Sequence, residues 1–206
     1  MSKIIRAGLS DQQNYPAIKD AGTQVQEIYI SGSPDLSASL RDYPYVETYK
    51  MLEEAGAYNL RLIDGSLVQM LYTFKRNAIQ SHRLAIFPAP HLESFDDAAE
   101  LYMNDVLYSE ITAKYLVKFP IRFDFSASDD EHIEFDHPKS HLTLGQYKGC
   151  RIPASAPLSP ATFMRFVTRH FYFPAIQSIG FSAPEDDPKF ADTISENERN
   201  LSFFWV

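Results

Sequence analysis

The clearest local pattern in the chain is a pair of apolar segments on either side of Asp64-Gly65. Residues 60–63 and 66–74 are mainly apolar. An Asp-Gly pair between two such segments is typical of a β-hairpin with a type I′ turn. A further apolar run over residues 83–87 is followed by a proline, and it predicts another strand.

Alternation of apolar and polar residues predicts further strands later in the chain. Between residues 119 and 126, apolar side chains alternate with polar ones that include Arg122 and Asp124. This is the period of a half-buried strand. Residues 132–136 alternate in the same way, and residues 141–147 predict a third strand that is interrupted by a glycine.

Apolar residues three and four positions apart predict three helices. They occupy residues 44–55, 96–116 and 159–172. Gly56 is expected to end the first helix, and Ser159 followed by proline is typical of a helix start. The order of these elements predicts an α+β fold, with a mostly antiparallel sheet of about five to six strands and helices packed on one face.

The chain is expected to form a single domain, residues 1–206, because its length is that of one ordinary domain. Residues 1–33 are weakly patterned, whereas residues 183–206 are acidic and end in Phe-Phe-Trp-Val. So apolar an end is expected to dock on the domain rather than to stay free. The single cysteine argues against a disulfide framework and against a multi-cysteine zinc site.

Several classes of function find no support in the sequence. The chain has no P-loop and no G-x-G-x-x-G, G-x-S-x-G or H-E-x-x-H motif, so Walker-type ATP hydrolysis, dinucleotide binding and α/β-hydrolase chemistry are not indicated. No apolar run reaches the roughly 18 residues that span a membrane, and the first residues do not have the pattern of a signal peptide. We therefore expect a cytoplasmic protein with no cofactor and no membrane partner.

The net charge of −8 is distributed unevenly along the sequence. Residues 1–90 are neutral, residues 91–137 carry −9, residues 138–182 carry +5 and residues 183–206 carry −4. The positive segment contains no aspartate or glutamate and several aromatic residues, a combination that suits an anionic ligand such as RNA. The alternative is that this segment pairs with the acidic segment before it. The whole-chain charge therefore excludes only a uniformly basic nucleic-acid binder.

Histidines are concentrated around the start of the positive segment. Imidazoles exchange protons near neutral pH, so His137 and His141 are candidates for the acid and the base of phosphodiester cleavage. The guanidinium of Arg151 would hold the developing negative charge. We therefore predict His137, His141 and Arg151 as catalytic residues. The residues expected to bind the substrate around them are Arg122, Asp124, Lys139, Ser140, Thr143, Arg165 and Arg169.

A second interpretation of this region is a metal site. If His132, Glu134 and Asp136 belong to one strand, their side chains share a face. Together with Asp124 or His141 from neighbouring strands, they would suit Mn²⁺, Zn²⁺ or Mg²⁺. The alternative is that these polar side chains form the solvated face of an exposed hairpin.

Short motifs in the second half of the chain resemble known proteins. His141-Leu142-Thr143-Leu144 resembles the H-x-T-x element of two-histidine phosphoesterases, in which the threonine steadies the phosphate, but this chain lacks the second copy of that element. The same strand is similar to the H-x-H strand of small bacterial toxin-type proteins, with Thr143 in place of the second histidine. Five blocks together resemble an uncharacterised bacterial protein family of about 200 residues, which implies no activity. The blocks are residues 62–67, 81–88, 120–124, 137–145 and 150–153.

Three hypotheses follow from these observations. The first is an effector of toxin-like or phage-defence type that acts on RNA or another phosphate ester. The second is a non-catalytic protein-interaction subunit of a larger bacterial complex, or a homo-oligomer. The third is a metal-dependent hydrolase. The first requires His137, His141 and Arg151 to converge, whereas the second predicts that these side chains are engaged in internal hydrogen bonds.

Overall fold

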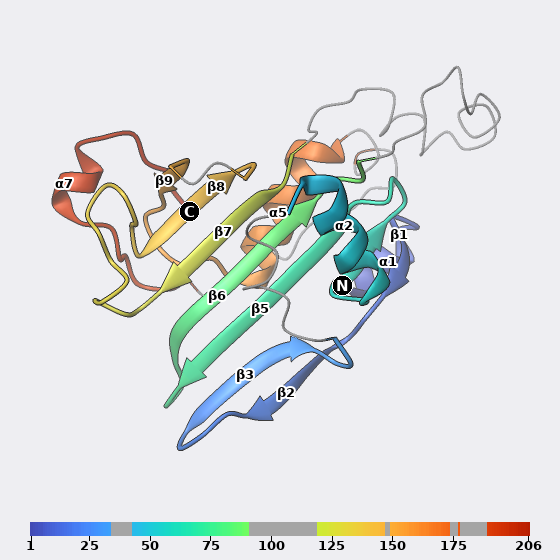
Figure 1. Cartoon of the computed structure of the whole chain (residues 1–206), viewed down its shortest axis with the longest axis horizontal. Helices are drawn as coiled ribbons and strands as arrows, with labels where there is room; N and C mark the ends of the chain where they lie inside the picture. Colours follow the sequence, from blue (N-terminus) through green and yellow to red (C-terminus); the bar gives the residue numbers. More distant parts are fainter. Residues whose placement is uncertain (34–42, 91–118, 147–148, 174–176, 178–188) are drawn as a thin grey trace.

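One antiparallel sheet runs through the chain (Figure 1). The computed structural model describes residues 1–33, 43–90, 119–146, 149–173, 177 and 189–206. Within these ranges nine strands form the sheet, and each of their pairings is antiparallel. The strands are β1 (Ser10–Gln13), β2 (Pro16–Asp20), β3 (Val25–Ile30), β4 (Leu60–Leu62), β5 (Leu67–Lys75), β6 (Ala78–Phe87), β7 (Ile121–Ser126), β8 (Ser140–Leu144) and β9 (Arg151–Pro153).

The order of the strands is β1-β4-β5-β6-β7-β8-β9, and β3, which carries β2, pairs with the second half of β5. The prediction of an α+β fold with a mostly antiparallel sheet is confirmed, but the sheet is larger than predicted. The additional strands include β1 and β2. Because β1 and β2 are largely exposed along their whole length, their sequences show no alternation of apolar and polar residues.

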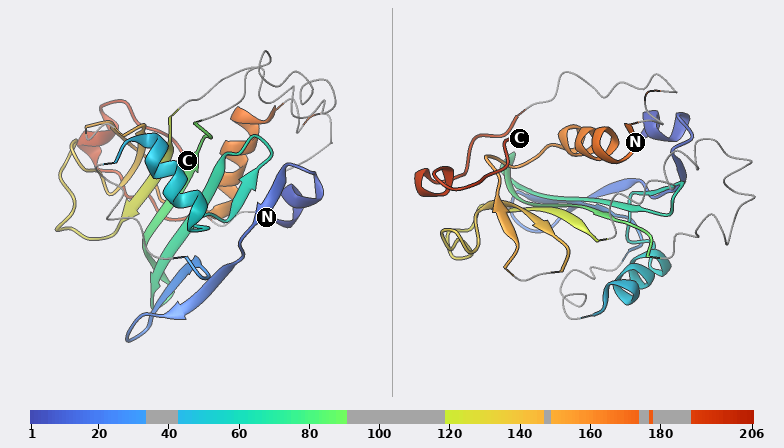
Figure 2. Two further views of the ribbon diagram at one scale, coloured as in Figure 1. Left: turned by 45° about the vertical axis from the view of Figure 1, so that its right-hand side comes forward. Right: turned by 90° about the horizontal axis from the view of Figure 1, so that it is seen from above.

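Helices cover both faces of the sheet (Figure 2). Phe163 and Val167 on one helix pack with Phe123 in the main core, whereas Tyr49 on another packs with Leu67 in a smaller core on the opposite face. The prediction that the helices share one face is wrong, because the first half of β5 is buried on both sides. The predicted helix over residues 96–116 lies outside the described residues. The helices of the described chain are α1 (Ser2–Arg6), α2 (Tyr45–Glu54), α5 (Pro160–Phe171) and α7 (Glu196–Arg199).

The hairpin of β4 and β5 lies where the sequence predicts it, but its turn is of a different type. Gly65 donates its N–H to the carbonyl of Leu62 at 2.8 Å. Within this turn only Gly65 has a positive φ, of 79°, whereas a type I′ turn needs two such residues. Two successive positive values, 51° and 64°, occur instead at Arg76 and Asn77. The type I′ turn therefore joins β5 to β6.

The predicted strand around residue 123 is confirmed as β7, whose side chains alternate between buried and half-buried. The predicted strand over residues 132–136 is wrong. This stretch is a turn, closed by backbone hydrogen bonds in both directions between Ile133 and His137. It pairs with itself rather than with a neighbouring strand, so its alternation does not produce a sheet face.

Two predicted helix boundaries are confirmed. The hydroxyl of Ser159 accepts the N–H of Thr162 at 3.1 Å, and Pro160 occupies the first turn of α5. The first turn of a helix has backbone N–H groups without a partner inside the helix, and the serine oxygen accepts one of them. At the end of α2, Gly56 has a φ of 61°, the left-handed conformation that glycine adopts readily after a helix.

The last residues of the chain lie beside β9. The N–H of Phe204 donates to the carbonyl of Pro153 at 2.7 Å, and the N–H of Ser155 donates to the carbonyl of Phe204 at 2.9 Å. The ring of Phe204 packs against Phe123 and Phe166, at centroid distances of 5.6 and 5.8 Å. The apolar end of the sequence therefore contributes to the main core. In the described part of the chain, no helix has the length and apolar character needed to cross a membrane.

Candidate functional site

Polar side chains form two adjacent rows across β6, β7, β8 and β9. Directly opposite residues of antiparallel strands project from the same face of a sheet. Ala85, which packs in the core beneath α2, lies opposite Arg122, so the rows continue the face that α2 covers. Neighbouring strands lie about 4.8 Å apart, and the rows are about 7 Å apart along the strands. We call the two rows the His/Arg face; they are Arg122, Thr143 and Arg151, and Arg83, Asp124 and His141.

Asp124 holds two of the guanidinium groups in place. Nε of Arg83 donates to its Oδ1 at 3.0 Å, and Nε of Arg122 donates to its Oδ2 at 2.7 Å. Burial alone would raise the pKa of Asp124, but the charges of Arg122 and Arg83 outweigh it and lower the pKa to about 2. The ionised carboxylate thus orients both arginines while these bonds use only their Nε atoms.

Thr143 lies between two arginines and has an unsatisfied hydroxyl. It is 5% exposed, and its Oγ1 has no hydrogen-bond partner among the described residues. The residues opposite it are Arg122 on β7 and Arg151 on β9. A buried hydroxyl without a partner costs about 1–3 kcal/mol, so its place between two cations suits an oxygen of an anionic ligand.

His141 is fixed in one tautomer. Nδ1 of His141 lies 2.8 Å from the carbonyl oxygen of Pro138, and because a carbonyl can only accept, the proton is on Nδ1 and the lone pair is on Nε2. Burial lowers the pKa of His141, and although Asp124 counteracts it, His137 and Arg151 add to the lowering. His141 is therefore neutral at pH 7, with Nε2 able to accept a proton.

The three residues predicted as catalytic lie together. The rings of His137 and His141 are 5.1 Å apart between centroids. Nη1 of Arg151 donates to the carbonyl of Asp136 at 3.1 Å, and Nδ1 of His137 donates to the carbonyl of Glu131. All three side chains are thus held by backbone carbonyls of the segment before β8, with one nitrogen of each histidine left for other contacts.

Four of the predicted substrate-binding residues do not belong to the His/Arg face. Ser140 projects from the other side of β8 and donates to the carbonyl of Ala156 at 2.9 Å. Lys139 forms an ion pair with an exposed aspartate. Arg165 and Arg169 lie on α5, which covers the opposite face of the sheet (Figure 2). Ser140, Arg165 and Arg169 are thus separated from the other predicted residues, because proximity in sequence does not determine which face a residue occupies.

His132, Glu134 and Asp136 do not share a strand face. Nε2 of His132 lies 3.2 Å from Oε1 of Glu198, and a carboxylate oxygen of Glu134 accepts the hydroxyl of Ser195 at 2.9 Å. No group of three His, Cys, Asp or Glu side chains in the described ranges could hold a metal ion. The strand that would have aligned these residues is absent, so the prediction of a metal site here loses its basis.

Arg83 is part of the His/Arg face, although the sequence pattern did not indicate it. It follows His82 in a strand whose remaining residues are mostly buried. The signal in the sequence was a single arginine within a strand of mostly buried residues. A charged side chain in such a strand needs a specific partner. That partner is Asp124, which alternation had already assigned to the polar face of the neighbouring strand.

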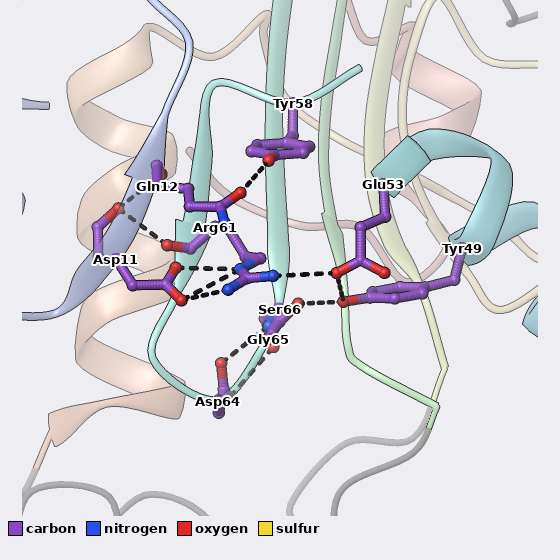
Figure 3. Close-up of polar contacts among 10 residues, drawn as sticks. Asp11, Gln12, Tyr49, Glu53, Tyr58, Arg61, Asp64, Gly65 and Ser66 are labelled. Carbon is purple, nitrogen blue, oxygen red and sulfur yellow. Dashed lines mark hydrogen bonds and ion pairs between the residues drawn. The ribbon is translucent and has the colours of Figure 1, made fainter. Parts of the chain in front are cut away.

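A second polar cluster surrounds Arg61 (Figure 3). Its guanidinium donates to Asp11 and, through Nη1, to Glu53 at 3.2 Å, and the bonds to Asp11 raise the pKa of Arg61. The hydroxyl of Tyr49 donates to the carbonyl of Gly65 at 2.6 Å. Because these charged groups pair with one another, the cluster fixes β1 and α2 on β4 and differs from the His/Arg face, where a buried hydroxyl is left without a partner.

An open cavity of about 520 Å³ lies at the ends of the β2–β3 and β5–β6 hairpins. None of its lining residues belongs to the His/Arg face, which is a surface of the sheet and not this cavity. The lining residues are Asp20, Gln24, Gln26, Phe74, Arg76 and Asn77.

Comparison with known proteins matches the chain to a family model. The model is described as an uncharacterized conserved protein, DUF2290, and it matches residues 9–206. No curated protein and no solved structure matches the chain.

Proposed function

We propose that this chain, which belongs to the DUF2290 family of conserved proteins, binds a phosphodiester of RNA on the His/Arg face and cleaves it. The observation that carries the proposal is the hydroxyl of Thr143, which is buried and unpartnered and lies opposite Arg122 and Arg151. Because this hydroxyl has almost no exposed surface in the free chain, a phosphate oxygen reaches it only when the side chains over it move aside. The oxygen then accepts this hydroxyl and at the same time neutralises the flanking guanidinium groups.

The charges of the face favour an anion. Three guanidinium groups and one carboxylate lie in the two rows, so the face keeps a net positive charge when the histidines are neutral. The carboxylate of Asp124 is turned to Arg83 and Arg122, and it therefore orients cations instead of meeting the ligand. This arrangement supports charge-assisted hydrogen bonds to a tetrahedral phosphate.

His141 is the proposed general base and His137 the proposed general acid. Nε2 of His141 removes the proton of a 2′-hydroxyl, O2′ bonds to phosphorus, and the bond between phosphorus and O5′ breaks. The leaving O5′ takes a proton from His137, so His141 gains one proton and His137 loses one. Arg122 and Arg151 stabilise the charge on the non-bridging oxygens. The products are a 2′,3′-cyclic phosphate and a 5′-hydroxyl end.

The biological setting that we propose is an effector of toxin-like or phage-defence type. The support is the sequence similarity of β8 to the histidine-bearing strand of small bacterial toxin-type proteins. A host-cell RNA would then be the substrate, and expression of the wild-type chain would slow growth in a manner that depends on His141.

The test measures binding and cleavage of a fluorescently labelled single-stranded oligouridine. We expect Arg151→Ala and Thr143→Val to weaken binding, the first by about tenfold or more, since a charge-assisted hydrogen bond is worth about 1.5–3 kcal/mol. Arg151→Ala should also reduce the slope of the logarithm of the binding constant against the logarithm of the salt concentration by about one. His141→Ala should abolish cleavage and leave binding within about threefold.

The matched control is Arg169→Ala, which removes an exposed arginine from α5 on the other face of the sheet. It should bind and cleave as the wild type does. In the wild type, the rising limb of the pH–rate profile should follow the lowered pKa of the general base His141, and the need for a protonated general acid should make the rate fall again at higher pH. Equal binding by Arg151→Ala, Thr143→Val and Arg169→Ala would contradict the proposal.

The second candidate function is that of a non-catalytic protein-interaction subunit. The hydrogen bonds of His137, His141 and Arg151 to backbone carbonyls favour it, because they give each side chain a structural role. In that case the wild type would neither bind nor cleave the oligouridine, and His141→Ala would only lower the stability of the fold. The RNA assay, repeated beside a thermal melt of each variant, distinguishes the two functions.

A further inference from the structure

We infer that the RNA bound on the His/Arg face is single-stranded and that one of its bases stacks on Phe135. This inference rests on the proposed function and adds to it a substrate class and a specificity-determining residue. It is drawn from the turn over residues 133–137, which precedes β8 and touches the His/Arg face through two of its members.

Phe135 combines two features that do not stabilise the folded chain. Its side chain is 47% exposed, so much of the apolar ring stays in water. Its φ is 69°, a left-handed conformation that is unfavourable for a bulky residue. An asparagine or glycine would form the same turn at lower cost. A strained, exposed aromatic residue beside a candidate site points to contact with a ligand.

The turn brings Phe135 within reach of the phosphate-binding groups. Nη1 of Arg151 lies 3.1 Å from the carbonyl oxygen of Asp136, the residue that follows Phe135. Standard bond lengths then place the Cα of Phe135 at most about 9 Å from that guanidinium nitrogen. On the other side of Asp136, the ring of His137 lies against His141. When the phosphate of a nucleotide contacts Arg151, the base of that nucleotide is therefore close enough to stack on the phenyl ring of Phe135.

The turn is held rigidly enough to serve as a stacking platform. The N–H of His137 donates to the carbonyl of Ile133 at 2.7 Å, and the reverse bond measures 3.1 Å. On either side of Ile133, His132 contacts the fully buried Glu198, and Glu134 accepts from Ser195. The turn is thus fastened to α7 and to itself. A platform that is already ordered loses little conformational freedom when a base stacks on it.

Stacking on an exposed loop residue selects single strands. In an A-form duplex each base is covered by its neighbours, so a protruding ring cannot reach a base face. In a single strand the bases can be splayed, and an aromatic side chain then adds affinity with little preference for sequence. Cleavage through a 2′-hydroxyl further restricts the substrate to RNA and makes DNA a binding competitor only.

The test uses the His141→Ala background, in which the RNA remains intact, and a labelled 12-nucleotide oligouridine, its duplex with oligoadenine, and inorganic polyphosphate as a ligand without bases. Phe135→Ala should weaken binding of the single strand about tenfold. Phe135→Tyr, which keeps a ring, should bind within about twofold of the parent. Inorganic polyphosphate should bind Phe135→Ala and Phe135→Tyr with equal affinity, because it has no base to stack. The duplex should bind the parent more weakly than the single strand does.

Phe173→Ala is the matched control, since it removes another exposed phenylalanine two residues after α5, and Arg151→Ala is the positive control. If Phe135→Ala binds as the Phe173→Ala control does while Arg151→Ala binds weakly, the stacking inference is wrong and the proposed function stands. Equal binding of duplex and single strand would also overturn it. If Arg151→Ala too binds normally, the proposed function itself fails.

Discussion

His82 and His141 lie on nearby strands but project from opposite faces of the sheet. His82 is 4% exposed, and its Nε2 accepts the N–H of Leu158 at 3.0 Å. Its Nδ1 therefore carries the proton and is left without a partner among the described residues. Burial lowers the pKa of His82 to about 4. His82 thus holds Leu158 over the core, whereas His141 belongs to the His/Arg face.

The lowered pKa of His82 predicts a loss of stability in mild acid. The unfolded chain takes up a proton near pH 6.5, but the folded chain resists it until about pH 4. The contribution is therefore complete above pH 6.5 and is lost as the pH falls from 6.5 to 4, by about 3 kcal/mol at most. Urea unfolding at pH 7 and pH 4.5 measures this difference in the free energy of unfolding.

The control for this measurement is His82→Gln, whose amide oxygen can still accept the N–H of Leu158. We expect this variant to lose much less stability between pH 7 and pH 4.5, while His141, whose pKa is also lowered by burial, leaves a smaller residual loss. A wild type and a variant with the same pH dependence would show that His82 does not cause the effect.

At the scale of elements, the two glycines of positive φ before β5 and before β1 differ in their surroundings. A Cβ on Gly65 would lie 3.0 Å from the Cβ of Ala89 and 3.4 Å from the hydroxyl of Tyr49. A Cβ on Gly8, whose φ is 70°, would meet nothing within 4 Å. Only the first position therefore combines backbone strain with a steric conflict.

This difference predicts the outcome of two matched substitutions. Gly8→Ala should destabilise the fold by about 1 kcal/mol, the cost of a left-handed alanine. Gly65→Ala should cost about 2–3 kcal/mol, because the turn must also move away from Ala89 and Tyr49. Chemical denaturation of the two variants measures both values, and equal losses would contradict the steric part of the argument.

The elements that the sequence predicts well are those determined by neighbouring residues. β7 alternates because one of its faces meets the core, and α5 begins at Ser159 because the cap is a local hydrogen bond. The stretch over residues 132–136 alternates equally well, yet contacts with α7 fix it as a turn. Such contacts join residues more than sixty positions apart, and no local pattern encodes them.

The same distinction applies to the candidate site. Arg122, Thr143 and Arg151 lie on one face because strand period and antiparallel pairing place them there, and both can be inferred from the sequence. Arg165 and Arg169 lie on the other side of the sheet, because the face on which α5 packs depends on the whole sheet. Arg83 is missed because its partner, Asp124, comes from a strand some forty residues later.

At the scale of the whole molecule, residues near both ends of the chain pack into the main core. Ile4 of α1 is buried in the main core, and Phe204 joins the same core beside β9. Phe204 thereby pairs with the edge of the sheet that carries Arg151. Covering a sheet edge in this way removes a template for pairing with other chains.

This arrangement predicts that the last residues stabilise the domain unequally. Phe204→Ala should cost about 2–4 kcal/mol, since the ring packs on Phe123 and Phe166 and its loss leaves a cavity. Trp205→Ala, at a residue 63% exposed, should change stability by less than about 0.5 kcal/mol. Thermal unfolding of both variants measures the difference, and a similar loss in each would contradict the docking of Phe204.

β8 carries core and chemistry in alternate positions of one short strand. Leu142 lies in the main core, while His141 and Thr143 on either side of it belong to the His/Arg face. A single residue inserted within the strand, between Ser140 and His141, would exchange the two sets, placing imidazole and hydroxyl in the apolar layer and leucine among the arginines. Substitutions can therefore vary the chemistry of this face one residue at a time, but a change of length here would destroy packing and chemistry together. Variation in length among related chains should accordingly fall in the turn before Ser140 or after Gly145, never between them.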